Sequence, residues 1–168
     1  KKLAEGDKYL YQWLAESFHG SQWIFENGGN LLSADNKTVV FNSPEAVEAI
    51  QFYYGLLTDK SAIYWGADQG ERIQGLKDGR IAMFSDGPYN MGIMKSAAPE
   101  MSGMWKVAVH PYSKQPGSYL GGTGLVIPAQ SKQKAAAWKF IEYAMRVENQ
   151  VGVYKYAGAA PALTAALE

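Results

Sequence analysis

Side chains that commonly carry catalysis are few in this chain, and their spacing does not suit it. There is no cysteine, and the two histidines, His19 and His110, do not follow a metal-binding spacing such as H-x-x-x-H. His110 precedes Pro111 at the end of a predicted strand, which favours a partly exposed structural histidine. Ser85-Asp86-Gly87 lacks the flanking glycine of a nucleophile elbow. The sequence therefore predicts no catalytic residue, no metal site and no cofactor.

Two other patterns resemble chemical motifs without completing one. The carboxylates that could form an acid–base pair are Asp68, Glu71, Asp78 and Asp86, and their place on and beside a helix favours a solvated face. The run Gly121–Gly124 lacks the Gly-Lys-Ser/Thr ending of a P-loop and the G-x-G-x-x-G spacing. It indicates either a kink or bulge in a strand, or a place where backbone approaches a ligand or passes between two lobes.

Aromatic side chains are the pattern that indicates a binding surface. They make up 13% of the chain, and several of them flank turns or loops, where they cannot all be core: Trp13, Tyr64, Trp65, Tyr89 and Trp105. An aromatic face packs on the C–H face of a sugar ring, while Asp, Asn and Glu bind its hydroxyls. This composition favours a carbohydrate among the possible ligands.

Composition excludes several classes of partner. Lys+Arg and Asp+Glu both number 16, so the charge gives no reason to expect nucleic acid or an anionic membrane as a partner. Hydrophobic residues form 47% of the chain, enough for a packed core. No apolar run approaches the roughly 18 residues of a membrane span, and no intact signal peptide opens the sequence. We therefore expect a folded domain that does not span a membrane.

The segment from Leu76 to Gly92 holds three structural signals in a row. Gly79 can end a helix, residues 81–85 are typical of a strand, and Asp86-Gly87-Pro88 favours the start of a second helix. Tyr89 is then expected in the first turn of that helix, just past a strand end, where open α/β sheets bind ligands. The alternative is an ordinary α/β connection with one exposed tyrosine.

Strands and helices alternate along the rest of the chain. Strands are predicted at Tyr9–Leu14 and Trp105–His110, with extended backbone at Tyr119–Ile127. Helices are predicted over five stretches, namely Ala15–Asn27, a helix capped by Ser43-Pro44, Gln69–Lys77, a helix capped by Ser131, and Val147–Tyr156. This alternation indicates the α/β class.

Two of the predicted helices carry an apolar face at helical spacing. Val47, Ile50, Tyr54 and Leu57 share one face of the helix that follows Ser43-Pro44. Trp138, Ile141 and Met145 share one face of the helix after Ser131. We expect both faces to pack against other elements.

Four segments, in order, resemble a known family. They are Trp23–Gly29 (WIFENGG), Asn42–Ile50 (NSPEAVEAI), Leu76–Tyr89 (LKDGRIAMFSDGPY) and Gly121–Ile141, with its GGTGLVIP, SK and AAAWKFI runs. Together they resemble the family 1 extracellular solute-binding proteins of bacterial ABC importers, the maltose-binding-protein-like group. The chain departs from the family pattern at Leu76, where phenylalanine is usual, and in the short aromatic loop Ser61–Asp68.

The resemblance implies a periplasmic-binding-protein-like type II fold, with two α/β lobes around a ligand cleft. Family members are longer, so the chain would be a C-terminal portion. Residues 1–118 would form most of the second lobe and residues 119–126 a crossover strand. Residues 127–157 would be helices of the first lobe, and residues 158–168 would return to the second.

The resemblance also implies which residues bind the ligand. By position Tyr89 matches the family's stacking aromatic, and Gly121, Gly122 and Thr123 match the crossover backbone at the cleft. Four further residues are expected on the cleft side of the second lobe, the last of them in the loop that departs from the family pattern: Trp13, Glu16, Ser17 and Trp65.

The function implied is capture of a sugar or oligosaccharide and its delivery to the permease subunits of an ABC importer, without catalysis. The location implied is periplasmic or extracellular, including anchoring by a lipid at an N-terminus upstream of this chain. Two alternatives stay open at this point. One is the truncated lobe of an α/β enzyme, and the other is a carbohydrate-sensing module without a transporter.

Overall fold

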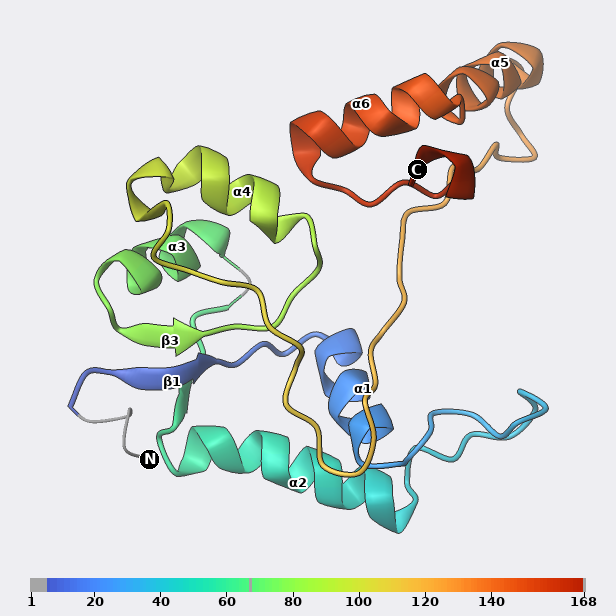
Figure 1. The fold of residues 1–168 in the computed structure, drawn as a ribbon. Coiled ribbons are helices and arrows are strands. Elements are labelled where there is room, and N and C mark those ends of the chain that lie inside the picture. Colours follow the sequence, from blue (N-terminus) through green and yellow to red (C-terminus); the bar gives the residue numbers. More distant parts are fainter. Residues whose placement is uncertain (1–5, 67, 168) are drawn as a thin grey trace. The chain divides into compact units, whose positions relative to one another are not determined.

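The computed structural model describes residues 6–66 and 68–167, and the chain divides into two compact units. The first, here called the sheet unit, comprises residues 1–86 and 103–120. The second, the helical unit, comprises residues 87–102 and 121–168. Each is described by itself (Figure 1). The assignment of residues to lobes stays a prediction.

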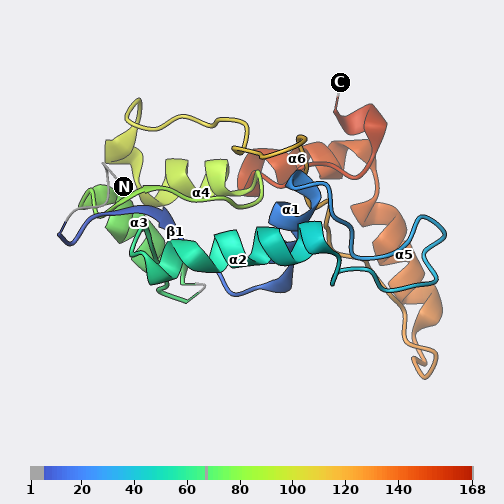
Figure 2. The ribbon, with the colours of Figure 1, turned by 90° about the horizontal axis from the view of Figure 1, so that it is seen from below.

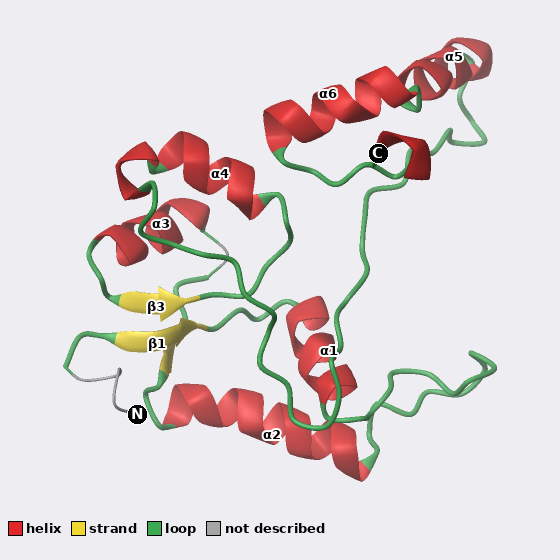
Figure 3. Ribbon diagram, viewed as in Figure 1, coloured by secondary structure: helices red, strands yellow, loops and turns green. Residues whose placement is uncertain are grey.

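A three-stranded parallel sheet forms the centre of the sheet unit (Figure 3). Its strands are β1 (Tyr9–Gln12), β2 (Ala62–Ile63) and β3 (Ile81–Met83), in the order β2-β1-β3. Tyr11 pairs with Ala62 on one side and with Met83 on the other. Because all three strands run in the same direction, their carboxyl ends meet at one edge of the sheet. The α/β class is confirmed.

Three helices complete the sheet unit, and local signals set two of their ends. They are α1 (Ser17–Glu26), α2 (Pro44–Thr58) and α3 (Gln69–Lys77). The Ser43 hydroxyl accepts a hydrogen bond from the backbone N–H of Ala46 at 3.3 Å, as an N-cap does. Gly79 follows α3 with a φ of +65°, in the left-handed region where glycine is favoured. Both ends were predicted.

The apolar face predicted for α2 is wrong for three of its four residues, while the fourth, Leu57, packs against the core cluster of Tyr11, Tyr53 and Ala62. Val47, Ile50 and Tyr54 are exposed, and the buried positions are Ala46, Ala49 and Tyr53. The two alanines, together with Ile24 of α1, form one core cluster. The residues buried between α1 and α2 are small because the two helices lie side by side (Figures 1 and 2), and a larger residue would hold the helices apart.

The turn after α1 shows how close this approach is. A Cβ on Gly29 would lie 3.2 Å from the backbone nitrogen of Ala46 and 2.9 Å from Cγ2 of Ile24. The second core cluster, Tyr11, Tyr53 and Ala62, joins α2 to the sheet. The core therefore places α2 against both β1 and α1.

The helical unit contains α4 (Asn90–Ala97), α5 (Lys134–Ala144) and α6 (Val147–Ala157), with short 3₁₀ turns at Pro99–Met101 and Thr164–Ala166. None of the residues of α5 and α6 is buried within the described structure. Of the predicted apolar face of α5, Trp138 is exposed, while Ile141 and Met145 are half-buried. No helix among the described residues is both long and apolar enough to cross a bilayer.

Several predicted elements differ in the structure. The stretches Trp105–His110 and Tyr119–Ile127 form neither strand nor helix, so the strand predicted at 119–126 is not formed. The role of these residues as a crossover between lobes stays a prediction. Gln133, not Ser131, precedes α5, and the Ser131 hydroxyl instead accepts from the N–H of Gln133 at 3.2 Å. A strand needs a neighbouring strand to pair with, and neither of the two stretches pairs with one among the described residues.

Candidate ligand-binding site

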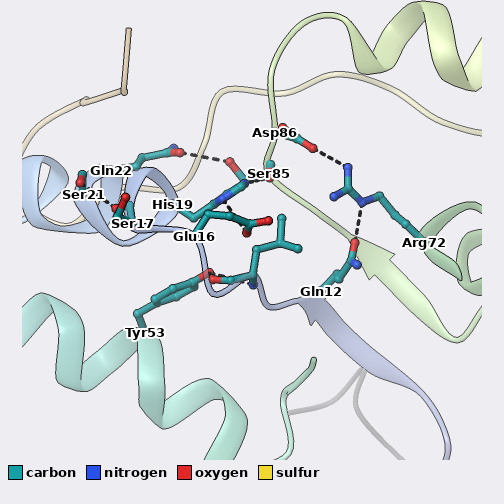
Figure 4. Close-up of polar contacts among 11 residues, drawn as sticks. Gln12, Glu16, Ser17, His19, Ser21, Gln22, Tyr53, Arg72, Ser85 and Asp86 are labelled. Atoms are coloured by element: carbon teal, nitrogen blue, oxygen red, sulfur yellow. Dashed lines mark hydrogen bonds and ion pairs between the residues drawn. The ribbon is translucent and has the colours of Figure 1, made fainter. Parts of the chain in front are cut away.

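The carboxyl edge of the sheet gathers the polar and aromatic residues that follow each strand. Trp13, Glu16 and Ser17 follow β1, Tyr64 and Trp65 follow β2, and Ser85 and Asp86 follow β3. In open α/β sheets, ligands bind outside the carboxyl ends of the strands. This edge is therefore the candidate site within the sheet unit (Figure 4).

Trp13 is held rigidly beside the sheet. Its ring stacks on Tyr53 with centroids 4.9 Å apart, and its Nε1–H donates to the backbone oxygen of Tyr53 at 3.0 Å. Tyr64 meets it edge-on at 5.8 Å. With one face committed to Tyr53, the half-buried indole can offer a ligand only its remaining face and edge.

Tyr53 fixes the backbone that leads out of β1. Its hydroxyl donates to the oxygen of Leu14 at 2.8 Å and accepts from the N–H of Leu14 at 3.1 Å. Burial raises the pKa of Tyr53 to about 12, so the phenol stays neutral and can play both roles. Burial likewise raises the pKa of Tyr11. These phenols support the site and do not take part in chemistry at neutral pH.

Glu16 and Ser17 lie at the start of α1, after the short connection that follows β1. Glu16 is the N-cap residue of α1, and its side chain makes no capping hydrogen bond. The side chain is 34% exposed, and a carboxylate at a helix N-terminus is stabilised by the helix dipole. Ser17 is exposed, and its backbone oxygen accepts from the Ser21 hydroxyl at 2.8 Å. Glu16 is thus the available hydrogen-bond acceptor at this edge.

His19, the third residue of α1, also lies at this edge. The sequence had predicted only that it binds no metal. Its ring is 5% exposed, and its Nε2 lies 3.1 Å from the backbone oxygen of Ser85. Its Nδ1 lies 3.5 Å from Oε2 of Glu16. Burial lowers the pKa of His19, against the opposing influence of the Asp86 and Glu16 carboxylates.

A buried ion pair closes the other side of the edge. Nη1 of Arg72 lies 2.5 Å from Oδ2 of Asp86, and both side chains are almost fully buried. Nε of Arg72 donates to Oε1 of Gln12 at 2.6 Å, and the guanidinium lies 4.7 Å from the centre of the Phe84 ring. The prediction of a solvated carboxylate was therefore wrong for Asp86. Arg72 fastens the end of β1 to the loop after β3.

Trp65 packs on α3. The Arg80 guanidinium stands 4.9 Å from the centre of its ring, and a Cβ on Gly75 would lie 2.3 Å from its Cζ3. The glycine at position 75 is what lets the ring approach the helix backbone. In this structure the Trp65 ring is a packing group of α3.

The other predicted site residues belong to the helical unit. Tyr89 is the N-cap residue of α4, one position before the first turn where it was expected, and its ring lies over Gly87, where a Cβ would be 2.4 Å from its Cε1. Gly121, Gly122 and Thr123 are exposed, and an added Cβ on Gly122 would meet nothing within 4 Å. The structure thus brings together Trp13, Glu16 and Ser17 in one unit, and it describes Tyr89 and the glycine segment within the other.

Comparison with known proteins decides what this arrangement belongs to. The family model described as "Bacterial extracellular solute-binding protein" matches residues 1–168. The chain belongs to this family.

The relatives of this solute-binding protein include transporter components. The "Probable ABC transporter-binding protein" of Deinococcus radiodurans is 24% identical over 134 residues, which cover 77% of this chain and 31% of that protein. A solute-binding protein of an ABC transporter from Thermotoga lettingae, crystallised with α-D-tagatose, is 28% identical with a TM-score of 0.78. The match covers 92% of this chain and 42% of that one.

A third relative shows the same fold at lower identity. The maltose-bound MalE3 protein of T. maritima is 20% identical with a TM-score of 0.72, over 96% of this chain and 44% of that one. The fold of the solute-binding chain is therefore that of periplasmic-binding-protein-like maltose-binding proteins. The chain spans less than half the length of each of these relatives.

Proposed function

We propose that this chain is part of a protein that captures a sugar or oligosaccharide in a cleft between two lobes and delivers it to an ABC import permease. The observation that carries the proposal is the likeness to the Thermotoga lettingae solute-binding protein, which holds for 92% of this chain and whose crystals contain α-D-tagatose. The protein binds its solute without converting it, and it works in the periplasm or outside the cell, including as a lipid-anchored form.

The chemistry of the sheet edge supports a polyhydroxylated ligand. Glu16 offers a partly exposed carboxylate, which accepts hydrogen bonds from hydroxyl groups. Trp13 is immobilised by Tyr53, so stacking on it costs little side-chain entropy. A rigid aromatic ring beside a carboxylate suits a ligand with apolar C–H faces and polar rims.

We further propose that Tyr89 contributes the main stacking ring, with Trp13, Glu16, Ser17, Trp65 and the backbone of Gly121, Gly122 and Thr123 completing the site. Tyr89 follows β3 in sequence and stands at the start of α4, the type of position at which α/β proteins bind ligands. The packing of its ring over Gly87 preorganises it. Of the proposed residues, Trp65 has the least direct support, because its ring packs on α3.

Calorimetric titration of the full natural chain with D-tagatose and with maltose tests the proposal. We expect Tyr89→Ala to weaken binding by about tenfold or more, the loss typical of one aromatic stacking contact together with its buried area. Tyr156→Ala is the matched control, because Tyr156 is an aromatic residue of the same unit that is 95% exposed. Unchanged affinity in Tyr89→Ala, with wild-type unfolding behaviour, would count against the assigned site.

Delivery to a permease is tested separately from binding. A strain that lacks this protein should lose uptake of the labelled sugar that calorimetry identifies, and the wild-type gene should restore it. Tight sugar binding together with unimpaired uptake would favour a sensing role without a transporter.

A further inference from the structure

Glu16 and His19 place two polar atoms opposite each other without a hydrogen bond between them. Oε2 of Glu16 and Nδ1 of His19 are 3.5 Å apart, and both atoms are buried. Neither of them has a hydrogen-bond partner among the described residues. Unsatisfied buried polar atoms are costly, and two such atoms directed at each other call for a physical cause.

The hydrogen on the His19 ring can be assigned from its other contact. Nε2 lies 3.1 Å from the backbone oxygen of Ser85, and a carbonyl oxygen can only accept. Nε2 therefore carries the hydrogen. In a neutral ring Nδ1 is then a bare acceptor, and the Glu16 carboxylate opposite it is an acceptor as well. Two acceptors facing each other repel unless a donor lies between them.

The two atoms are too close for a water molecule to bridge them, because two hydrogen bonds through one water span roughly 4.5 Å or more and these atoms are 3.5 Å apart. Both atoms are covered by surrounding protein, although the Glu16 side chain as a whole is 34% exposed. The exposed part of Glu16 is thus available to a ligand, while Oε2 points inward at the ring. The donor that fits without displacing any atom is a single proton bound to Nδ1.

The groups around the pair act in opposite directions on that proton. Burial of the ring and the Arg72 cation of α3 disfavour it, and together they outweigh the favourable fields of Glu16 and of Asp86, which follows β3. The Phe18 ring, 4.3 Å away, and the Ser85 carbonyl complete the surroundings. Together these groups lower the pKa of His19, so Nδ1 carries no proton in the free protein at neutral pH.

We propose that His19 is a positioning residue for Glu16, and that the two side chains take up one shared proton when a ligand covers Glu16, which fixes the direction of the Glu16 carboxylate. The proton comes from solvent and binds Nδ1, which then donates to Oε2 and leaves Oε1 directed outward. This inference rests on the proposed function, because it assumes that Glu16 binds the ligand. A ligand that strips water from Oε1 increases the need for a positive charge behind the carboxylate and so favours protonation.

Nuclear magnetic resonance of the two histidines tests the pair without any ligand. The ¹⁵N shifts of the imidazoles report which ring nitrogen carries hydrogen, and His110 serves as an internal reference in the same spectra. We expect His19 to carry hydrogen on Nε2 alone at about pH 7.5 and to gain it on Nδ1 as the pH falls below its ordinary value of about 6.5. The ¹³C shift of the Glu16 carboxyl should follow the same titration.

The Glu16→Gln variant sharpens the test because an amide nitrogen can donate to Nδ1 permanently. We expect this variant to lose the Nδ1 protonation of His19 over the range in which the wild-type protein shows it, while the His110 signals stay unchanged. Glu48→Gln is the matched control, because the side chain of Glu48 is 69% exposed. It should leave the His19 titration as in the wild type.

Two results would overturn the inference. One is hydrogen on Nδ1 of His19 at about pH 7.5, which would mean that the pair is already hydrogen-bonded. The other is a His19 titration that Glu16→Gln does not alter. Failure of the proposed function gives a different picture, in which the wild-type and variant spectra behave as expected but no sugar binds.

Discussion

The helix α1 carries a glutamate–histidine pair at each end, and the two pairs are built differently. At its start, Nδ1 of His19 lies 3.5 Å from Glu16 without a hydrogen bond. At its end, Nδ1 of His110 lies 2.9 Å from both carboxylate oxygens of Glu26. Two pairs of the same residue types, one at each end of α1, therefore differ: the Glu26–His110 pair is hydrogen-bonded and the Glu16–His19 pair is not.

The pair at the end of α1 fastens a long irregular segment. The Gln22 amide donates to Oε1 of Glu26 at 3.1 Å, and the backbone N–H groups of Lys114 and Gln115 donate to the backbone oxygen of Glu26 at 2.9 and 3.2 Å. The Trp23 ring meets His110 edge-on at 4.8 Å. Residues 103–120 have no helix or strand, and these contacts help to attach them to the rest of the sheet unit.

The difference between the two pairs indicates which carboxylate stabilises the fold and which is available to bind a ligand. The Glu26 carboxylate, 3% exposed, has its hydrogen bonds made within the protein, as a buried charge requires. Glu16 is 34% exposed and keeps hydrogen-bonding capacity in reserve. A group whose bonds are all made holds the fold, whereas a group with bonds to spare can bind something else.

The largest effect should come from removing the two glutamates in turn. Glu26→Ala should lower the free energy of unfolding by about 3 kcal/mol, because it leaves His110 and Gln22 without their acceptor in a buried place. Glu16→Ala should cost about 0.5 kcal/mol or less, as for a partly exposed side chain. Urea unfolding measures both.

Glu48→Ala is the control for these two variants. Its carboxylate is exposed and lies 3.8 Å from the Lys114 ammonium, and its Oε2 accepts a hydrogen bond from Nδ2 of Asn27 at 2.8 Å. We therefore expect a loss of about 1 kcal/mol, between those of the other two variants. Equal losses for Glu26→Ala and Glu16→Ala would remove the distinction between the two pairs.

Replacing each histidine by phenylalanine should give a smaller contrast in the same direction. His110→Phe removes the donor from a buried carboxylate, and we expect a loss of about 2 kcal/mol. His19→Phe gives up the bond to the Ser85 oxygen but also removes one of two opposed acceptors, so the change should stay within about 1 kcal/mol. A larger loss for His19→Phe than for His110→Phe would show that the Glu16–His19 pair, and not the Glu26–His110 pair, contributes more to the stability of the fold.

Local signals predicted the helix ends of the sheet unit, because each signal lies within a few residues of what it controls. They missed β2, in a stretch expected to be irregular, and wrongly predicted a strand at Trp105–His110. Ser43-Pro44 starts α2 and Gly79 follows α3, in both cases through the backbone geometry of one turn. His110 was expected to be a partly exposed structural histidine, and its pairing with Glu26 confirms this.

Contacts between distant residues were not predictable in the same way. Glu26 and His110 are 84 positions apart, and Gln12 and Arg72 are 60 apart. Pairing them requires the strand order and the side of the sheet on which each helix packs, which no spacing in the sequence supplies. One partial signal existed, since Arg72 adjoins Ile73 and lies four residues before Leu76, on the buried side of α3.

The face of α2 was missed for a different reason. Hydrophobic periodicity identifies large apolar residues, but the tight contact with α1 selects the small ones, Ala46 and Ala49. The proposed site residues share this limit. Their types and order along the chain predicted a site, while their side-chain partners, such as Tyr53 behind Trp13, became visible only in the structure.

The smallest expected effect is a pH dependence that the buried His19 at the start of α1 should produce. Burial holds the pKa of His19 below its unfolded value of about 6.5, so below that pH the unfolded chain binds more protons than the folded one. The free energy of unfolding should therefore fall as the pH drops from about 6.5, with a slope of at most about 1.4 kcal/mol per pH unit from this one group. In His19→Phe that slope should disappear, whereas His110→Phe should keep it. Measuring urea unfolding of the three proteins at several pH values separates the two pairs by their response to acid, and a slope that survives in His19→Phe would assign it to another group.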